Sequence, residues 1–334
     1  MSAAAPPLGA AQARPLDTLV AFTRRNAWSI GLIAVLVGLL LFTKALQPRY
    51  GPITLQGLAT SVQPLLLAAV AQAIVVISGG IDLSIGSMMA LTSVVSASLM
   101  AKQSEEVGVA VVLGVLLLGI ALGAVNGAVV VITRVPDIVV TLAMSFVWAG
   151  SALLVRSAPG GGAASWLKSL VVGPLANEWI PKAAVVALVV VFVVWIPLSR
   201  SRLGLSIYSI GSDRLAAFRS GVSVGPTRFA AYVMTGLFSA LAGLSLTATT
   251  GIGSPVPGPY TLFSVAAVVL GGVSLAGGRG GVFGPIVAVV VLQLIQTDLT
   301  FLRVDSNLAL VAQGAILIAV VMVGSLITMR RSRG

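Results

Sequence analysis

The sequence contains no cysteine and no histidine. These absences exclude disulfides, thiol nucleophiles and imidazole bases, and they remove the side chains that most often bind transition metals. No GxxxxGK[ST] phosphate-binding loop occurs either, so the chain cannot hydrolyse ATP by that route. We therefore expect neither a metal site nor a bound cofactor in this chain.

Charged residues are also scarce. They make up 9% of the 334 residues, against about 25% in soluble domains. Hydrophobic residues make up 57%, and the mean hydropathy is +1.08. This balance predicts a protein solvated mostly by a lipid bilayer. The net charge of +11 does not indicate a nucleic-acid partner, because the basic residues are separated by apolar runs and form no single patch.

Apolar stretches recur at the length of roughly 20 residues that an α-helix needs to cross a bilayer. They predict an all-α, polytopic membrane protein with about ten transmembrane helices, near residues 28–46, 57–77, 84–100, 108–133, 135–155, 181–199, 230–249, 260–276, 282–299 and 308–328. The regions 57–100 and 260–299 are also compatible with broken or re-entrant helices. A transmembrane domain would then cover residues 28–328.

The two chain ends are expected to lie outside the bilayer, as residues 1–27 and 329–334. The first is rich in alanine and proline, then basic, and it lacks a short apolar core followed by a cleavage site. We expect a disordered tail there and not a signal peptide. With ten spans and the N-terminus inside, thirteen of the twenty lysines and arginines fall on the inner side. This orientation places both termini in the cytoplasm.

The inner loop 199–229 carries five arginines between apolar neighbours. Ser212 and Asp213 are helix N-cap types, residues 214–220 favour a short helix, and Gly221 suits a left-handed C-terminal stop. Such a helix would display Leu215 and Phe218 on one face, and two turns are marginal in water without a partner surface. On composition alone, the simpler explanation is a basic loop that only fixes the topology.

Glycines and aromatic residues indicate two further surfaces. Gly119, Gly123 and Gly127 form a GxxxGxxxG ridge, which lets another helix approach closely. The outer loop 156–181 contains tryptophans, which anchor a chain at the membrane interface or offer a docking surface for an external partner.

Polar side chains within the apolar stretches are candidates for a translocation path or gate. Asp82 is the most isolated acid there, and it could cap the helix that begins nearby or take part in gating. Other polar residues could contact a passing substrate or join helices by hydrogen bonds: Gln63, Gln72, Asn126, Thr141, Ser145 and Trp148.

Two stretches match each other closely, VVISGGIDLSIG at 75–86 and VVLGGVSLAGG at 268–278, which hints at an internal duplication. In the predicted topology both descend toward the cytoplasm, so they do not indicate an inverted repeat. Together with Asn126-Gly127, Pro136 with Thr141-Leu142, and the element at 211–221, these motifs resemble the permease subunit of bacterial ribose-type ABC sugar importers. The resemblance runs in order from about residue 62 to residue 323.

This resemblance implies a ten-helix permease fold in the bacterial cytoplasmic (inner) membrane. It implies a dimer with a second permease subunit, cytoplasmic ATPase subunits that bind ATP and magnesium, and an extracytoplasmic sugar-binding protein. The coupling element that would dock into the ATPase consists of Gly211, Ser212, Asp213, Arg214, Leu215, Ala216, Ala217, Phe218, Arg219 and Gly221. Leu215 and Phe218 would enter a groove on the ATPase, with Arg214 and Arg219 at its rim.

The sequence departs from the family pattern at 260–264, where acidic residues are usual, and at Asp137 and Ala143. These departures leave the identity of the sugar and of the second permease subunit open. The predicted function is the translocation path for a monosaccharide. An ion-coupled sugar carrier is the alternative, although few ionisable residues approach the midplane. A membrane-embedded enzyme would need a cluster of reactive side chains, and the sequence shows none.

Overall fold

A computed structural model of the protein describes residues 15–305 and, beyond them, residues 308, 311, 312, 314, 315, 318 and 322. Within 15–305 the chain folds into twelve helices and no β-strand. In order they are α1 (Pro15–Leu46), α2 (Pro52–Ile77), α3 (Ile85–Met100), α4 (Glu105–Thr133), α5 (Asp137–Val155), α6 (Ser165–Val171), α7 (Lys182–Arg200), α8 (Arg202–Ser212), α9 (Arg214–Arg219), α10 (Val224–Thr250), α11 (Tyr260–Leu270) and α12 (Phe283–Phe301).

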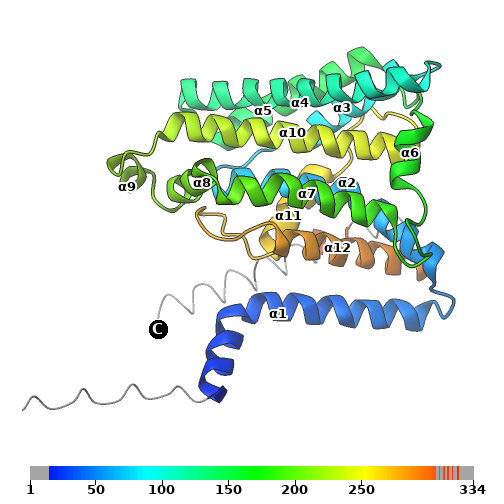
Figure 1. The fold of residues 1–334 in the computed structure, drawn as a ribbon, viewed down its shortest axis with the longest axis horizontal. Helices are drawn as coiled ribbons and strands as arrows, with labels where there is room; N and C mark the ends of the chain where they lie inside the picture. The colour runs from blue at the N-terminus through cyan, green and yellow to red at the C-terminus, as the bar shows by residue number, and fades with distance from the viewer. Residues whose placement is uncertain are drawn as a thin grey trace, which may run out of the picture.

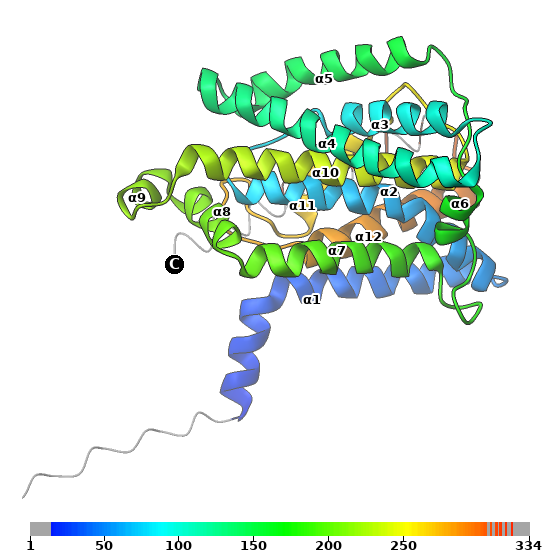
Figure 2. The same ribbon diagram turned by 45° about the horizontal axis from the view of Figure 1, so that its top comes forward.

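The long helices run roughly parallel to one another in a single bundle (Figure 1; Figure 2). Short helix α9 lies at one end of the bundle, on the left in both views, and short helix α6 lies at the opposite end. We refer to these as the α9 end and the α6 end.

Seven described helices are long and apolar enough to cross a membrane: α1 from Trp28 onward, α2, α4, α5, α7, α10 and α12. The predicted all-α, polytopic class is therefore confirmed. The predicted total of ten spans is not reached among the described residues. Two of the predicted spans are the shorter helices α3 and α11, and the last, 308–328, lies mostly outside the described residues.

Helix α1 begins earlier than the sequence analysis expects. It starts at Pro15, so the segment expected to be a disordered tail is helical from that residue onward. Proline suits the first position of a helix, and no glycine or further proline interrupts residues 16–27. The first part of α1 bends away from the bundle in both views (Figure 1; Figure 2). Trp28 joins α1 to the rest, because its Nε1 donates to the Leu270 carbonyl oxygen at 2.8 Å.

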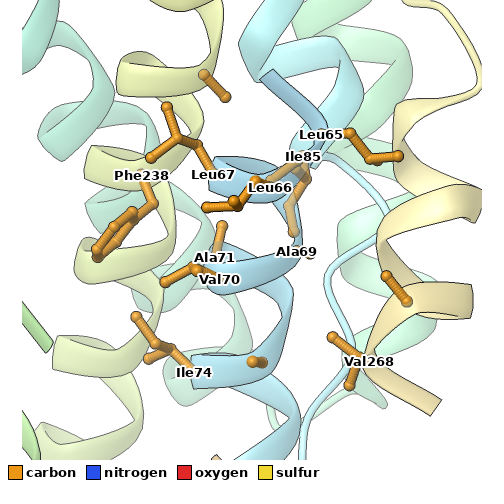
Figure 3. Close-up of a cluster of buried hydrophobic side chains, with 14 of the residues drawn as sticks. Leu65, Leu66, Leu67, Ala69, Val70, Ala71, Ile74, Ile85, Phe238 and Val268 are labelled. Carbon is orange, nitrogen blue, oxygen red and sulfur yellow. The ribbon is translucent and has the colours of Figure 1, made fainter. Parts of the chain in front are cut away.

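Helix α2 forms the centre of the core. Its last 16 residues, from Val62 onward, are all buried, and a helix that is apolar on all sides belongs inside a bundle. It packs against α7, α10, α11 and α12. Figure 3 shows α2 between Phe238 of α10 and Val268 of α11, with Ile85 at the start of α3 beside it.

The glycine ridge of α4 packs against α10. A Cβ atom added at Gly119 would lie 2.6 Å from the Gly236 carbonyl oxygen, and one at Gly123 would lie 3.0 Å from the Gly236 Cα. A Cβ atom added at Gly127 would lie 3.0–3.3 Å from atoms of Phe229 and Tyr232, which also belong to α10. These distances are too short for most side chains, so the two backbones approach closely because both helices carry glycine at the contact.

The loop 156–181 lies at the α6 end and includes α6. Trp166 in it donates from Nε1 to the Glu105 carbonyl oxygen at 3.1 Å and lies against Gly108 at the start of α4. Trp179 has 57% of its surface exposed. The first tryptophan is thus partly buried against the start of α4, whereas the second is exposed.

Candidate functional site

Two helices of the bundle begin in its middle and run in opposite directions. Helix α3 runs toward the α6 end, where the Ala97 carbonyl oxygen accepts from the N–H of Gly162. Helix α11 runs toward the α9 end. Their starts meet, since Gly86 N–H of α3 donates to Thr261 Oγ1 of α11 at 2.9 Å. At 16 and 11 residues, these helices extend only about 24 and 16 Å, less than the roughly 30 Å of a hydrocarbon core.

Each half-length helix is preceded by a non-helical segment, 78–84 before α3 and 251–259 before α11. Non-helical backbone at membrane depth is tolerated where it is buried in protein or lines a cavity. Broken helices of this kind form substrate sites in many transporters, near the middle of the bilayer. The sequence analysis allowed for broken helices in both regions, and the structure places one in each.

The two matching motifs end α2 and α11 in the same way. Gly80 N–H donates to the Val75 carbonyl oxygen at 3.0 Å, and Val273 N–H donates to that of Val268 at 3.1 Å. The preceding residues, Gly79 and Gly272, have φ of 81° and 80°. This arrangement is a Schellman motif, which places glycine at the left-handed position. The sequence similarity therefore reflects one local structure used twice.

A chain of buried side-chain hydrogen bonds ends at Asp82. Trp148 Nε1 donates to Asn126 Oδ1 at 3.1 Å, and Asn126 Nδ2 donates to Ser84 Oγ at 2.7 Å. Ser84 Oγ donates in turn to Asp82 Oδ1 at 2.6 Å. The chain joins α5 and α4 to segment 78–84. Asp82 and Asn126 have no exposed surface, so these bonds are shielded from water.

Asp82 does not cap α3 in the way considered from the sequence. Its Oδ1 accepts from the N–H of Ser84, which is the N-cap residue itself, so it fixes the turn that leads into the helix. Its Oδ2 finds no hydrogen-bond partner among the described residues. Thr141 secures the same segment from α5, because its Oγ1 accepts from Leu83 N–H at 3.0 Å and lies 3.2 Å from the Ile81 carbonyl oxygen.

Other path candidates lie apart from this network. Gln63 and Gln72 are buried in α2, and both amide atoms of Gln72 lack partners among the described residues. Ser145 donates to the Leu142 carbonyl oxygen of its own helix. The structure thus brings together Asp82, Asn126, Thr141 and Trp148. It leaves Gln63, Gln72 and Ser145 outside this network.

Helix α9 forms where the short helix is expected. Asp213, and not Ser212, supplies the N-cap, since its Oδ1 accepts from Leu215 N–H at 2.8 Å and Ala216 N–H at 2.9 Å. Gly221 follows the helix with φ of 84°. Leu215 and Phe218 are 57% and 67% exposed, so both apolar side chains face outward from the α9 end.

Arg214, which is expected at the rim of a docking surface, also contacts the protein itself. Its Nη2 donates to the Gly79 carbonyl oxygen at 2.8 Å, which ties α9 to the start of segment 78–84. Burial lowers the pKa of the Arg214 guanidinium from its usual value, and the positive charge of Arg228 acts in the same direction. The Arg214 guanidinium therefore reaches back to segment 78–84, although the residue remains exposed beside Leu215 and Phe218.

Glycines from three parts of the chain meet beside α9, and we call this contact the glycine junction: Gly79, Gly211, Gly277 and Gly278. A Cβ atom at Gly277 would lie 2.7 Å from the Gly211 carbonyl oxygen and 2.9 Å from the Gly79 Cα. Gly278 N–H donates to the Ile77 carbonyl oxygen at 2.9 Å. The ends of α2 and α8 and the loop after α11 therefore touch through their backbones.

Sequence reasoning missed a cluster around Asp137. This residue forms an ion pair with Arg228, and Tyr232 donates from its hydroxyl to Asp137 Oδ2 at 2.8 Å. Arg228 and Tyr232 belong to α10, so the cluster joins the starts of α5 and α10. The available signal was Asp137 itself, a charge at a position where an apolar residue was expected.

The described residues also surround a polar cavity in the half of the bundle nearest the α6 end, with a volume of about 510 Å³. Helices α2, α10, α11 and α12 contribute to it. It is lined by Thr60, Ser61, Pro64, Leu65, Leu246, Thr249, Thr250, Gly258, Pro259, Tyr260, Phe263, Gln293 and Gln296. The path candidates named from the sequence are not among these residues.

Comparison with known proteins gives consistent results. A D-allose transport system permease protein of Escherichia coli strain K12 is 30% identical over 259 residues, covering 76% of this chain and 77% of that protein. The ribose import permease protein of the same strain is 31% identical over 313 residues, covering 89% and 94%. The autoinducer 2 import system permease protein of strain K12 is 29% identical over 319 residues, covering 92% of this chain and 95% of that protein.

No solved structure gives a significant match. The family model described as "Branched-chain amino acid transport system / permease component" matches residues 54–321. The match favours the permease interpretation over an ion-coupled carrier and over a catalytic enzyme. Since it covers most of the chain, this multi-pass membrane protein belongs to that family of permease components.

Proposed function

We propose that this chain is the transmembrane permease subunit of an ATP-driven importer for a monosaccharide. Two permease subunits would work with cytoplasmic ATPase subunits, which hold ATP and magnesium, and with an extracytoplasmic binding protein. The substrates of the ribose and D-allose permeases similar to this chain support a neutral sugar as the substrate. The permease itself would perform no covalent chemistry.

In this proposal the α9 end faces the cytoplasm and the α6 end faces outward. Four arginines at the α9 end support this orientation, because loops on the cytoplasmic side are enriched in basic residues: Arg200, Arg202, Arg214 and Arg219. The exposed Trp179 at the α6 end would then be available to an external partner.

A single observation carries the proposal, the pair of exposed apolar side chains on α9. Leu215 and Phe218 lie on a capped helix that projects from the end of the bundle, outside the apolar spans. An apolar face of this kind is suited to a groove on a second protein. In a transporter subunit that lacks a phosphate-binding loop, the partner that this face would serve is an ATPase.

The contacts behind α9 provide a physical route from that partner to the broken helices. A displaced α9 would pull on Gly79 through Arg214. It would also move Gly211, which is in backbone contact with the loop after α11. Both paths reach the half-length helices, so nucleotide binding could favour one of two arrangements of α3 and α11.

Phe218→Ala tests the docking surface. Burying a phenylalanine side chain contributes about 1.5–3 kcal/mol, or roughly 10- to 150-fold in a binding constant. The variant should insert normally but lose co-purifying ATPase and uptake of radiolabelled D-ribose together. Phe42→Ala is a matched control, since Phe42 is 48% exposed on α1, away from α9. Unchanged co-purification and uptake in Phe218→Ala would contradict the proposal.

Arg214→Ala separates docking from transmission. The substitution removes the bond to Gly79 but leaves the exposed face of α9 in place. We expect the ATPase to co-purify as before, while sugar uptake per ATP hydrolysed falls. If uptake and hydrolysis stayed in the same ratio, Arg214 would have no part in coupling.

A further inference from the structure

The polar cavity near the α6 end contains no charged side chain among its described lining residues. It lies between α2, α10 and α12, three of the apolar helices long enough to cross a membrane, and the shorter helix α11. An ion transferred to such a site without a partner would lose several kcal/mol of solvation. The cavity is therefore suited to an uncharged molecule that still offers many hydrogen bonds.

The lining offers hydrogen-bond acceptors along one wall. Thr60 Oγ1 donates to the Gln56 carbonyl oxygen at 2.6 Å, and Thr249 Oγ1 donates to that of Leu246 at 3.0 Å. Thr250 Oγ1 also lies 2.8 Å from the Leu246 carbonyl oxygen. Because the hydroxyl protons of Thr60 and Thr249 are used within their own helices, the lone pairs of these two oxygens remain for a ligand, whereas Thr250 Oγ1 also accepts from Ile252 N–H at 3.4 Å.

Helix α12 supplies donors to the same cavity. Gln293 and Gln296 lie three residues apart, so they share one face of the helix. Neither side-chain amide hydrogen-bonds to another described residue, although each has two N–H donors and an acceptor oxygen. Unused amides beside unused hydroxyl lone pairs match the alternating donors and acceptors of a sugar.

Helix α11 adds aromatic rings and free backbone donors. Tyr260 and Phe263 present apolar ring surface to the cavity, which suits the C–H face of a sugar ring. Pro259 gives the helix no side-chain cap, so the first N–H groups of α11 lack intrahelical partners. The volume of about 510 Å³ falls within the range of about 300–1,000 Å³ that is common for ligand pockets.

We infer that this cavity is a sugar-binding site within the permease, in which Gln293 and Gln296 donate to the hydroxyls of a neutral polyhydroxylated compound of monosaccharide size. The inference rests on the proposed importer function. It adds a site and its specificity residues to that function. The start of α11 lines the cavity, so movement of that half-length helix would open or close the site.

Single cysteines provide the first test, and the chain has none of its own to interfere. Gln293→Cys would be labelled in the complete importer with a small thiol reagent, with and without D-ribose, D-allose or D-glucose. We expect the sugar that is transported to slow labelling severalfold, whereas D-ribonate, which carries a carboxylate, should not. Gln103→Cys is the control, because Gln103 lies between α3 and α4 and does not line the cavity.

Kinetics provide the second test. Each of Gln293→Ala and Gln296→Ala should raise the KM for uptake roughly 2- to 12-fold, the effect expected from one hydrogen bond. Gln103→Ala should match the wild type in all measurements.

The outcomes separate the two proposals. If the wild-type importer transports a sugar but that sugar neither protects Gln293→Cys nor loses apparent affinity in the alanine variants, the cavity is not its binding site. In that case the importer function stands. If the complete wild-type assembly transports none of the three sugars, the sugar-importer function fails, and the inference fails with it.

Discussion

The two non-helical segments of the bundle are held in different ways. Segment 78–84 is bonded by side chains of three other helices: Asn126 of α4, Thr141 of α5 and Arg214 of α9. Segment 251–259 has one firm tether, the reciprocal backbone bonds between Gly253 and Gly160 at 3.0 and 2.8 Å.

The two segments also differ in how much of their surface is exposed. Asp82 and Ser84 in the first segment have no exposed surface, whereas Ile252 and Val256 in the second are 41% and 65% exposed. Segments with few buried contacts open at lower free energy than segments with many. The comparison indicates that 78–84 is the more firmly held segment and that 251–259, beside the polar cavity, opens at lower free energy.

The largest effect is expected at the glycine junction, beside the start of segment 78–84. In Gly211→Ala the new methyl group would overlap the Ile77 carbonyl oxygen and lie 2.6 Å from Gly278 N, and backbone atoms cannot rotate away. We expect a loss of about 3 kcal/mol or more in the free energy of unfolding, measured by SDS titration in micelles. Gly57→Ala, which has no heavy atom within 4 Å of the added Cβ, should lose nothing.

Asp82→Leu should be the next most damaging change. It removes the acceptor for both the N–H and the hydroxyl of buried Ser84, at a cost of about 2–3 kcal/mol. Asp82→Asn keeps an acceptor oxygen and places its amide where Oδ2 has no described partner, so its stability should stay within about 1 kcal/mol of the wild type. If Asp82→Asn abolished uptake while the protein stayed stable, the negative charge itself would be needed for gating.

A smaller loss is expected where the two half-length helices meet. Thr261→Val keeps the shape of the side chain but removes the acceptor for Gly86 N–H, at a cost of about 1–2 kcal/mol in the same titration. Thr261→Ser retains the hydroxyl and serves as the control. Equal stability of both variants would mean that the contact between α3 and α11 adds nothing to the fold.

The smallest effect is expected in segment 251–259. Ser254 Oγ reaches only the Val256 carbonyl oxygen of its own segment, at 3.4 Å. Ser254→Ala should therefore change the unfolding free energy by less than about 0.5 kcal/mol. A loss as large as that of Asp82→Leu would break the comparison, since it would show that segment 251–259 is held as firmly as segment 78–84.

The helical class was predictable because lipid leaves so few alternatives. A continuous apolar stretch in a bilayer must satisfy its backbone as a helix, and each of the seven long apolar helices matches a predicted span. The predicted spans 84–100 and 260–276 begin within one residue of α3 and α11. That both helices start in the middle of the bundle was not predictable, because it depends on long-range contacts such as the one from Gly86 to Thr261. The start of α1 at Pro15 was missed because composition favoured a tail.

Parts of the site were accessible from local patterns. The cap at Asp213 and the exposed pair on α9 follow from short-range spacing. The bond from Arg214 to Gly79 does not, because it joins residues 135 positions apart and only the folded bundle places them together. That Gln293 and Gln296 line a cavity was equally hard to predict, because glutamine in an apolar helix can also form hydrogen bonds between helices.

The shared ending of α2 and α11 has a consequence for covariation among relatives. Gly80 and Val273 occupy equivalent positions, yet only Gly80 is constrained by its surroundings, since an added Cβ would overlap Asp137 Oδ2 and lie 3.1 Å from the Tyr232 hydroxyl. The glycine therefore leaves room for the carboxylate at 137, which a side chain at position 80 would displace. Substitutions at 80 and 137 should be coupled, and a Gly80→Ala change should cost measurably less stability in an Asp137→Ala background than alone.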